Sequence, residues 1–329
     1  MARTRPPSPP APLSQRERRG NKFSLVIPIR NGGALLGECV GAILQQSLLP
    51  KEILLFDTES GDGAVEKAAL LIQKKKIPVR VFSVRREEFD HGGTRNKALL
   101  AAKYPWVLYL TQDAVPADAK AFEWLFSAVS SGKKVVAAYG KQLPHRNASA
   151  LAATARAFNY GDTRILQDME HAPLLGIKTW FTSNSFCVWN KAALIAAGGF
   201  AEKLILGEDM HAAARLIQAG GAVAYEPRAL VRHSHNYSAI EEFRRYFDIG
   251  VFHRLHAGLL FQAGNANKEG LRFVLRQAMA LVKEGAYGSL LRLPFHIAAK
   301  FIGYKLGRNF TVFSRSITRA LSMHKTYWN

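Results

Sequence analysis

The stretch FSLVIPIRNGG, residues 23–33, decides the fold class of this 329-residue chain. Its first seven residues are mostly apolar, which is typical of a strand buried on both faces, and the turn residues Arg30-Asn31-Gly32-Gly33 follow at once. A helical pattern of apolar residues then runs over 34–46 and stops before Pro50. A buried strand followed by a turn and a helix is the building unit of parallel sheets.

The same unit recurs along the first half of the chain, roughly every 25 residues. Further buried strands are predicted at 52–57, 78–84, 106–111 and 135–140, with helices at 64–75 and from Gly93 onwards. This alternation predicts an α/β fold with a Rossmann-like, mainly parallel sheet and helices on both faces. Ligands bind such sheets beyond the carboxyl ends of the strands. The candidate ligand-binding segments are therefore Arg30–Gly32, Asp57–Asp62 and Thr111–Ala114.

The second half of the chain is less regular. We predict strands at 183–190, 222–227 and 229–234, and helices at 208–219 and from Ile240 to about Leu260. Beyond Gly264-Asn265 the pattern favours basic amphipathic helices at 268–284 and 289–322. The predicted organisation is a disordered basic tail over 1–22, an α/β domain over 23–260 and a C-terminal helical extension over 261–329.

The formal net charge of +20 is concentrated at the two ends of the chain. Residues 1–22 contain six Lys or Arg and one acid, and residues 254–329 contain twelve Lys or Arg and two acids. Basic ends of this kind attract nucleic acid, anionic lipid or acidic substrates. Nucleic acid is disfavoured, because the excess basic residues avoid the α/β core and no nucleic-acid-binding module is recognisable.

The sequence also excludes several classes of protein. The N-terminal segment has no apolar core, so it is not a secretory signal, and no stretch reaches the length of about 18 apolar residues that a membrane span needs. Cys39 and Cys187 show no zinc-ligand spacing, which favours buried thiols in a reducing compartment. The motifs GxGxxG, GxxxxGK[ST] and GxSxG are absent, so dehydrogenase, P-loop and hydrolase functions lose their main support.

Two acids stand where predicted strands end. Asp113 can hold a hard cation such as Mg²⁺ or Mn²⁺ together with substrate phosphates, or it can cap the turn before Pro116. Asp57 can accept hydrogen bonds from a base or ribose, or serve as an ordinary turn residue. Position alone leaves both interpretations open for each acid.

Two further pairs have chemical potential. Glu208-Asp209 follows Gly207 at a helix start, where acids are stabilised by the positive helix end and where a carboxylate can also act as a general base. His233 and His235 alternate on an extended segment, so their side chains point to the same side and can share one ligand. Spacing alone does not choose between the structural and functional interpretations.

The segment from Asp90 to Asn96 (DHGGTRN) lies between the third strand and a helix. Its glycines allow close approach of the backbone, and the helix N-terminus favours an anion. Arg95 is therefore expected to bind a phosphate group.

Eight segments taken together resemble inverting glycosyltransferases of family 2, which have the GT-A fold. More narrowly, they resemble the bacterial rhamnosyltransferases that use dTDP-L-rhamnose. The segments occur in the family's order over about residues 23–255. They are VIPIRNGG (26–33), FDTESGDGA (56–64), EFDHGGTRNKAL (88–99), LTQDAVP (110–116), YGKQLP (139–144), TSNSFCVW (182–189), LGEDMHAA (206–213) and HSHNYS (233–238).

The resemblance assigns roles to particular residues. Asp113 matches the last acid of the family's DxD metal motif, but Thr111 stands at the first position, so one of the pair His233 and His235 is expected to complete the metal site. Glu208 and Asp209 match the family's ED motif, with Asp209 as the base. Trp180 and Asn184 are assigned to the acceptor side. The expected nucleotide-sugar-binding residues are Pro28, Arg30, Asn31, Asp57, Glu59, Asp62, Asp90, His91, Arg95 and Gln112.

The implied reaction is a single displacement in which Asp209 deprotonates an acceptor hydroxyl and a divalent cation, Mg²⁺ or Mn²⁺, neutralises the leaving diphosphate. The implied acceptor is a glycan or lipid-linked glycan of surface polysaccharide synthesis. The basic C-terminal helices predict peripheral association with the anionic inner face of the bacterial cytoplasmic membrane, or else a helix packed on the catalytic domain. A UDP-hexose donor and a non-catalytic glycan- or nucleic-acid-binding protein remain as alternatives.

Overall fold

The first half of the chain forms the predicted repeating units. The computed structural model describes residues 13–14, 21–132, 134–260 and 267–328. The elements of this half are β1 (Phe23–Ile29), α2 (Gly33–Ile43), β2 (Glu52–Asp57), α3 (Ala64–Lys74), β3 (Val79–Ser83), α4 (His91–Ala101), β4 (Trp106–Leu110), β5 (Val115–Pro116), α5 (Ala121–Val129) and β6 (Val135–Leu143). Strands β1 to β4 pair in parallel, because each strand is followed by a helix that carries the chain back across the sheet.

The second half completes the sheet and then leaves it. Its elements are α6 (Ala150–Asn159), β7 (Ile165–Gln167), α7 (Ala172–Leu175), β8 (Phe186–Asn190), α8 (Lys191–Ala196), α9 (Glu208–Gln218), β9 (Ala222–Arg232), α10 (Ala239–Leu255), α11 (Ala257–Leu260), α12 (Asn267–Lys283), α13 (Tyr287–Arg308) and α14 (Arg315–Leu321). The strand order is β3-β2-β1-β4-β8-β6-β9-β5, and β7 pairs with residues 223–225 of β9, on the edge that β5 covers at residues 231–232. Strand β8 runs antiparallel to both β4 and β6.

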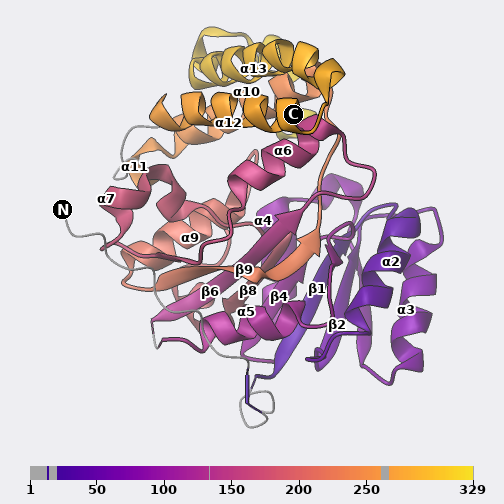
Figure 1. Ribbon diagram of the computed structural model, residues 1–329. Coiled ribbons are helices and arrows are strands. Elements are labelled where there is room, and N and C mark those ends of the chain that lie inside the picture. Colours follow the sequence, from indigo (N-terminus) through magenta and orange to yellow (C-terminus); the bar gives the residue numbers. More distant parts are fainter. Residues whose placement is uncertain (1–12, 15–20, 133, 261–266, 329) are drawn as a thin grey trace.

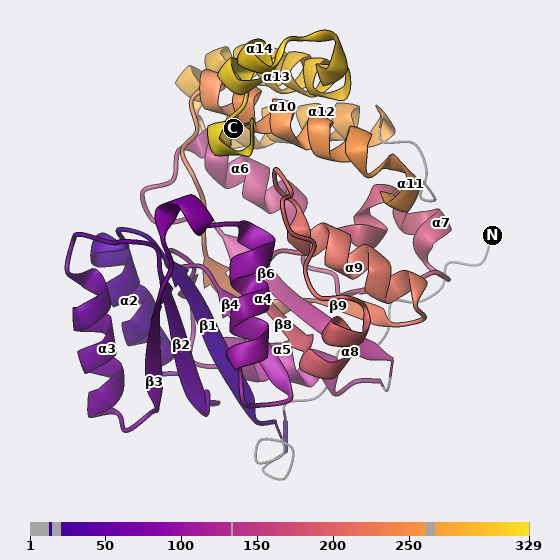
Figure 2. The same cartoon turned by 180° about the vertical axis from the view of Figure 1, so that it is seen from behind.

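Helices cover both faces of the sheet, as predicted (Figures 1 and 2). One core contains Val40 of α2, Ala68 of α3 and Phe122 of α5. The other contains Leu99 of α4 and Ile217 of α9. The prediction of an α/β fold with a Rossmann-like sheet is therefore confirmed, and Cys39 and Cys187 are buried free thiols.

Three predicted elements differ in detail. The strands expected at 222–227 and 229–234 form one strand, β9, because a register shift opposite Gly140-Lys141 accommodates the interruption at Pro227-Arg228. The helix expected from Ile240 to Leu260 breaks after Leu255 into α10 and α11. The helix expected at 289–322 is divided by residues 309–314 into α13 and α14.

Helices α10, α12, α13 and α14 form a separate layer over the end of the sheet at which α4 begins (Figure 2). Two glycines of α13 let this helix pack closely on α10. A Cβ atom added to Gly307 would lie 2.0 Å from the carbonyl oxygen of Phe247, and one added to Gly303 would lie 2.3 Å from that of Phe243. The backbones of α10 and α13 therefore touch. Within the described residues, no helix is long and apolar enough to cross a membrane.

Candidate active site

A cluster of three metal-ligating side chains lies at the carboxyl ends of β4 and β9. Asp113, His233 and His235 each offer one ligand atom, and these atoms lie within 4.8 Å of one another. Nε2 of His233 is 3.5 Å from Oδ2 of Asp113, and Nε2 of His235 is 4.0 Å from the same oxygen. The short strand β5, which follows Asp113, pairs with β9, and this pairing brings residues 120 positions apart in the chain into one site.

The tautomer of His233 follows from its neighbours. Arg156 can only donate, and its Nη1 lies 2.7 Å from Oε1 of Gln142, so this atom of Gln142 is the carbonyl oxygen. The same oxygen is 2.9 Å from Nδ1 of His233, which must therefore carry the proton. The Nε2 lone pair of neutral His233 then faces the carboxylate of Asp113.

Two hydrogen-bond acceptors that face each other in a buried site repel unless a cation lies between them. Protonation of His233 is opposed, because burial lowers the pKa of this imidazole. Burial, and then the neighbouring His233, lower the pKa of His235 to about 4, so both rings are neutral near pH 7. The three residues therefore fit a divalent cation, and two imidazoles with one carboxylate suit Mn²⁺ better than Mg²⁺, which prefers oxygen ligands.

The acid pair Glu208-Asp209 begins α9 and has two different environments. Gly207, with φ of 79°, turns the chain into the helix, and a Cβ atom here would lie 2.8 Å from the Phe252 ring. Glu208 is buried, with Oε1 3.3 Å from Nη1 of Arg95. Asp209 is half-buried and accepts backbone hydrogen bonds, from the amides of Asn184 at 3.0 Å and Met210 at 2.8 Å. Its carboxylate is oriented and keeps further acceptor capacity.

The surroundings shift the pKa values of Glu208 and Asp209 in opposite directions. Burial, followed by the adjacent negative charge of Glu208, raises the pKa of Asp209 above the usual range of an aspartic acid. Burial also opposes ionisation of Glu208, but the nearby Arg95 and His91 outweigh it and lower the pKa of Glu208. A carboxylate with a raised pKa beside one that stays ionised is the pattern of a general base and its electrostatic partner.

The loops after β1 and β2 form a cradle held by side chain-to-backbone hydrogen bonds. The amide of Gly33 donates to Asp62 at 2.8 Å, and the amide of Gly61 donates to Asn31 at 3.0 Å. Gln112 exchanges two hydrogen bonds with the backbone of Arg30, at 2.8 and 3.0 Å. Asp62, Asn31 and Gln112 thus shape the cradle.

Other predicted nucleotide-binding residues lie at the mouth of this cradle. Asp57 ends β2 and accepts from the amide of Ser60 at 3.3 Å. Glu59, with φ of 49°, is exposed on the turn that follows, and Pro28 is partly exposed near the end of β1. Asp57 and Glu59 therefore remain accessible to a nucleotide.

The role expected for the Asp90–Asn96 segment needs correction. Arg95 is buried and its Nη1 bonds to Glu208 and to the carbonyl of His91, so it is not free to bind a phosphate group. Asp90 caps α4 by accepting from the amide of Gly93 at 2.6 Å. The expected close approach at Gly92 does occur, but its partner is the protein backbone. A Cβ atom added to Gly92 would lie 2.0 Å from the carbonyl oxygen of Ala201.

The two acceptor-side predictions have different outcomes. Trp180 is fully buried, and its indole donates to the carbonyl of Leu260 at 3.1 Å, so it is a core residue and does not face an acceptor. Asn184 is buried beside the acid pair: its side chain donates to Glu208 at 3.2 Å and accepts from Trp189 at 2.9 Å. It holds the acid pair in place.

Several residues of this site had no assigned role in the sequence. Gln142 and Arg156 orient His233, as described above. Arg245 of α10 is exposed, lies 5.8 Å from the centre of the Tyr237 ring, and pairs with no carboxylate among the described residues. Tyr237 in turn stacks on His235 at 5.2 Å. No local motif marks Arg245, because only the return of α10 over the sheet brings it here.

The C-terminal segment also reaches the site. The amides of Met323 and His324 donate to the fully buried Asp248 of α10, at 2.9 and 3.0 Å. The ring of His324 then lies edge-on to that of His91 at 5.8 Å. The end of the chain therefore packs next to the Arg95–Glu208 pair.

Comparisons with known proteins agree with this geometry. The sequence profile described as Glycosyl transferase family 2 matches residues 24–189. The chain is 40% identical over 309 residues to the O-antigen chain rhamnosyltransferase RfbN of Salmonella typhimurium, covering 94% of this chain and 96% of that protein. The O-antigen chain rhamnosyltransferase WbaN of Salmonella anatum is also 40% identical, with 93% and 96% covered.

Solved structures share the fold at low sequence identity. The mannosyltransferase PcManGT from Pyrobaculum calidifontis, in complex with GDP-Man and Mn²⁺, superposes with a TM-score of 0.55 at 16% identity, over 93% of this chain and 84% of that chain. TarS of Staphylococcus aureus in complex with UDP gives a TM-score of 0.51 at 14% identity, over 89% and 91%. These likenesses concern the fold alone.

Proposed function

This chain belongs to glycosyl transferase family 2, and we propose that it transfers L-rhamnose from dTDP-L-rhamnose to a hydroxyl group of a glycan in surface polysaccharide synthesis. The two relatives at 40% identity, both called O-antigen chain rhamnosyltransferases, support the choice of sugar. The structural observation that carries the proposal is the position of two groups at the same end of the sheet. One is the Asp113–His233–His235 cluster, and the other is the Glu208-Asp209 pair with its raised Asp209 pKa.

The reaction is a single displacement at the anomeric carbon. Asp209 removes the proton from the acceptor hydroxyl, whose oxygen forms the new bond to the anomeric carbon as the bond to the diphosphate breaks. The proton stays on Asp209, whose raised pKa makes it a better proton acceptor than an ordinary aspartate. One displacement inverts the anomeric centre, so a β-L-rhamnosyl donor gives an α-L-rhamnoside.

Asp113, His233 and His235 would hold the divalent cation, with Mn²⁺ favoured by their donor set. When bound, such a cation supplies electrostatic stabilisation to the diphosphate leaving group. Gln142 keeps His233 in the tautomer that this binding needs. Mg²⁺ remains the alternative cation.

We assign to Arg245 the phosphate-binding role that the sequence analysis expected for Arg95. Its guanidinium is exposed, without a carboxylate partner among the described residues, and stands near the metal cluster through Tyr237 and His235. A planar guanidinium binds phosphate oxygens with two parallel hydrogen bonds. We assign Arg245 to the leaving diphosphate, while Arg95 keeps Glu208 ionised.

The outer surface of the C-terminal layer is the part expected to contact a membrane. Exposed apolar residues recur at helical spacing on α12 (Leu275, Met279, Val282) and on α13 (Tyr287, Leu291, Phe295, Ile302). Exposed basic residues lie among these apolar residues (Arg276, Lys283, Arg292) and one helical turn beyond them (Lys305). This mixture suits peripheral binding to the anionic inner face of the bacterial cytoplasmic membrane, close to a lipid-linked acceptor.

The membrane proposal is tested by co-sedimentation with anionic liposomes. Serine at both Leu291 and Phe295 should weaken binding, whereas serine at the exposed Leu70 of α3, outside the C-terminal layer, should leave it unchanged. Equal binding of the Leu291/Phe295 variant and the wild type would exclude this surface as the membrane contact.

The donor is tested by a thermal-shift screen of dTDP-L-rhamnose against UDP-hexoses, with and without Mn²⁺. Because a ligand that binds only the folded protein raises the melting temperature, the true donor should give the largest shift, and the shift should depend on the metal. A larger shift with a UDP-hexose would move the proposal to that donor. No shift with any nucleotide sugar would favour a non-catalytic glycan-binding protein.

A further inference from the structure

The end of the chain is fixed to Asp248, a fully buried acid of α10. Its Oδ2 accepts hydrogen bonds from the backbone amides of Met323 and His324, at 2.9 and 3.0 Å. The amide of His324 also donates to the hydroxyl oxygen of Ser322 at 3.0 Å. Burial of a carboxylate is unfavourable, and it raises the pKa of Asp248 to about 6. Because these hydrogen bonds offset that cost, Asp248 fixes the position of the segment 322–324.

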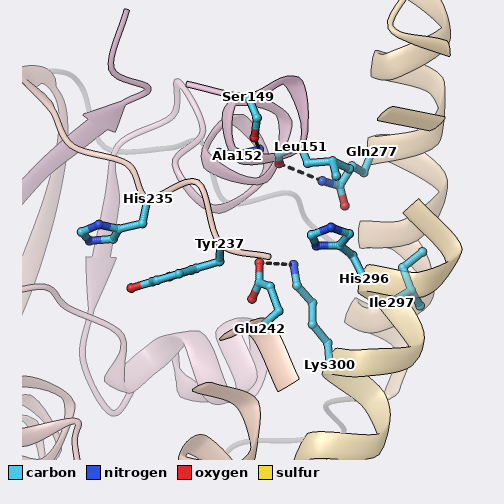
Figure 3. Close-up of a pocket in the computed structure, with 10 residues that line it drawn as sticks. All are labelled: Ser149, Leu151, Ala152, His235, Tyr237, Glu242, Gln277, His296, Ile297 and Lys300. Carbon is cyan, nitrogen blue, oxygen red and sulfur yellow. Dashed lines mark hydrogen bonds and ion pairs between the residues drawn. The ribbon is translucent and has the colours of Figure 1, made fainter. Parts of the chain in front are cut away.

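Helix α10 is in turn attached to the rest of the protein. Nζ of Lys300 in α13 lies 3.2 Å from Oε1 of Glu242, near the start of α10 (Figure 3). Figure 3 also shows Gln277 of α12, whose side chain donates to the carbonyl of Leu151 in α6 at 3.0 Å. These contacts join the C-terminal layer to the catalytic domain, so Asp248 stands on a fixed support.

The ring of His324 begins a row of side chains that leads to the acid pair. It meets the ring of His91 edge-on, with the ring centres 5.8 Å apart. The ring of Phe89 also packs edge-on against His91, at 5.0 Å. Nη1 of Arg95 lies 3.4 Å from Nδ1 of His91 and 3.3 Å from Oε1 of Glu208. Two aromatic rings therefore pack around the imidazole that borders the Arg95–Glu208 ion pair.

Both imidazoles of this row are neutral rings near pH 7. Burial, and then His91 and Arg245, lower the pKa of His324 to about 4. Burial also lowers the pKa of His91, although the charge of Glu208 opposes that shift. His324 therefore adds no charge beside Glu208. It adds a packed ring where water would otherwise stand.

The exclusion of water matters because the neighbour of Glu208 is the proposed base. Burial, and then the negative charge of Glu208, raise the pKa of Asp209, while the hydrogen bonds it accepts and Arg95 oppose this shift. Tyr160 and Cys187 also face Asp209, but burial raises the pKa of both, so they are uncharged near pH 7. A like charge acts more strongly where water does not screen it. Dry packing around Glu208 therefore makes Asp209 a stronger base.

We propose that His324 is a positioning residue for the acid pair: held in place by Asp248, its ring covers His91 and keeps water from the ion pair behind it. The inference rests on the proposed function, in which Asp209 is the general base. His324 acts through the strength of that base and not on the substrate itself. A merely structural ring would affect the stability of the fold but not the pKa of Asp209, so the two roles can be told apart.

The test uses the full chain labelled with ¹³C at its aspartate carboxyl groups, and the Asp209 signal is identified by its loss in Asp209→Asn. An NMR titration of this signal gives the pKa of Asp209 without any substrate. His324→Ala should lower that pKa by about 0.5 to 1, because water then screens the charge of Glu208. His324→Phe should restore it, since a neutral ring fills the same place.

Two further variants complete the titration. Ser322→Ala removes one hydrogen bond to the segment 322–324, so it should lower the pKa of Asp209 by a smaller amount, and it serves if His324→Ala does not fold. His253→Ala is the matched control. His253 is a half-buried imidazole of α10 whose pKa burial, followed by Arg308, lowers to about 4, and its Nδ1 faces the hydroxyl of Tyr304 at 3.1 Å. Its loss should leave the pKa of Asp209 unchanged.

The inference is overturned if the pKa of Asp209 is the same in His324→Ala, or in Ser322→Ala where that variant replaces it, as in the wild type. An equal fall in His253→Ala, or no recovery in His324→Phe, would overturn it as well.

Turnover gives a second measurement of the same role. With dTDP-L-rhamnose, His324→Ala should move the acidic fall of the pH–rate profile to lower pH and reduce the maximal turnover by about 2- to 3-fold, with KM for the donor within about 2-fold of the wild type. A change in KM alone would indicate a donor-binding residue and contradict the inference. A wild type that releases no dTDP would overturn the proposed function, and the NMR titration would still decide whether His324 sets the pKa of Asp209.

Discussion

The replacement of Gln142 by methionine tests the metal site without touching a ligand. Gln142 is 2% exposed, and its side chain makes hydrogen bonds of 2.9 Å to His233, 2.7 Å to Arg156 and 2.9 Å to Ser183. Methionine keeps the volume and removes all of them. We expect His233 to lose its fixed tautomer and orientation, and Mn²⁺ affinity to fall by about 10- to 100-fold.

The same change should also destabilise the protein. Two neutral hydrogen bonds contribute about 1 kcal/mol each and the one from Arg156 about 2 kcal/mol, so unfolding should become easier by roughly 4 kcal/mol. Gln167→Met is the matched control. Gln167 is 1% exposed and donates to three carbonyl groups, those of Lys178, Thr179 and Phe181, away from the metal cluster.

The assay is calorimetric titration of Mn²⁺ into each variant, with the melting temperature measured separately in EDTA. Both variants should melt earlier than the wild type, but only Gln142→Met should lose metal affinity. The reasoning fails if Gln142→Met binds Mn²⁺ as tightly as the wild type, or if Gln167→Met loses as much affinity.

Three further predictions address other parts of the site. Since Asp209 must be ionised to act, turnover should fall on acidification at a higher pH than for an ordinary aspartate, and Glu208→Gln, which removes the like charge, should move this fall to lower pH in a pH–rate profile. Arg245→Gln should weaken dTDP binding by about 10-fold or more in a titration, whereas Arg244→Gln should not. Gly307→Ala forces a Cβ atom against the backbone of α10 and should lower the free energy of unfolding by about 3 kcal/mol in denaturant titrations.

The sequence predicted the first half of the fold closely, because its strands are apolar runs buried on both faces and its turns carry glycine and asparagine. Strands β1 and β2 occupy the predicted residues. The pattern was less informative for β9, since Pro227 looks like a boundary and only the pairing with β6 shows that the strand continues past it.

The site was predictable where a residue ends a strand and not where it depends on distant packing. Asp113 stands at such an end, and it does lie with His233 and His235. Arg95 has every local sign of a phosphate ligand, but Glu208, far along the chain, takes its guanidinium. Arg245 has no local sign at all, because its place beside Tyr237 exists only after α10 folds back over the sheet.

The most direct test of the account is the turnover of Asp209→Asn, measured as dTDP release from dTDP-L-rhamnose with Mn²⁺ and a bacterial lipid-linked glycan. The change keeps the shape of the side chain, so donor binding should stay within about 2-fold of the wild type, while the loss of the base should lower turnover by about 100- to 10,000-fold. Turnover close to that of the wild type would contradict the claim that this carboxylate deprotonates the acceptor.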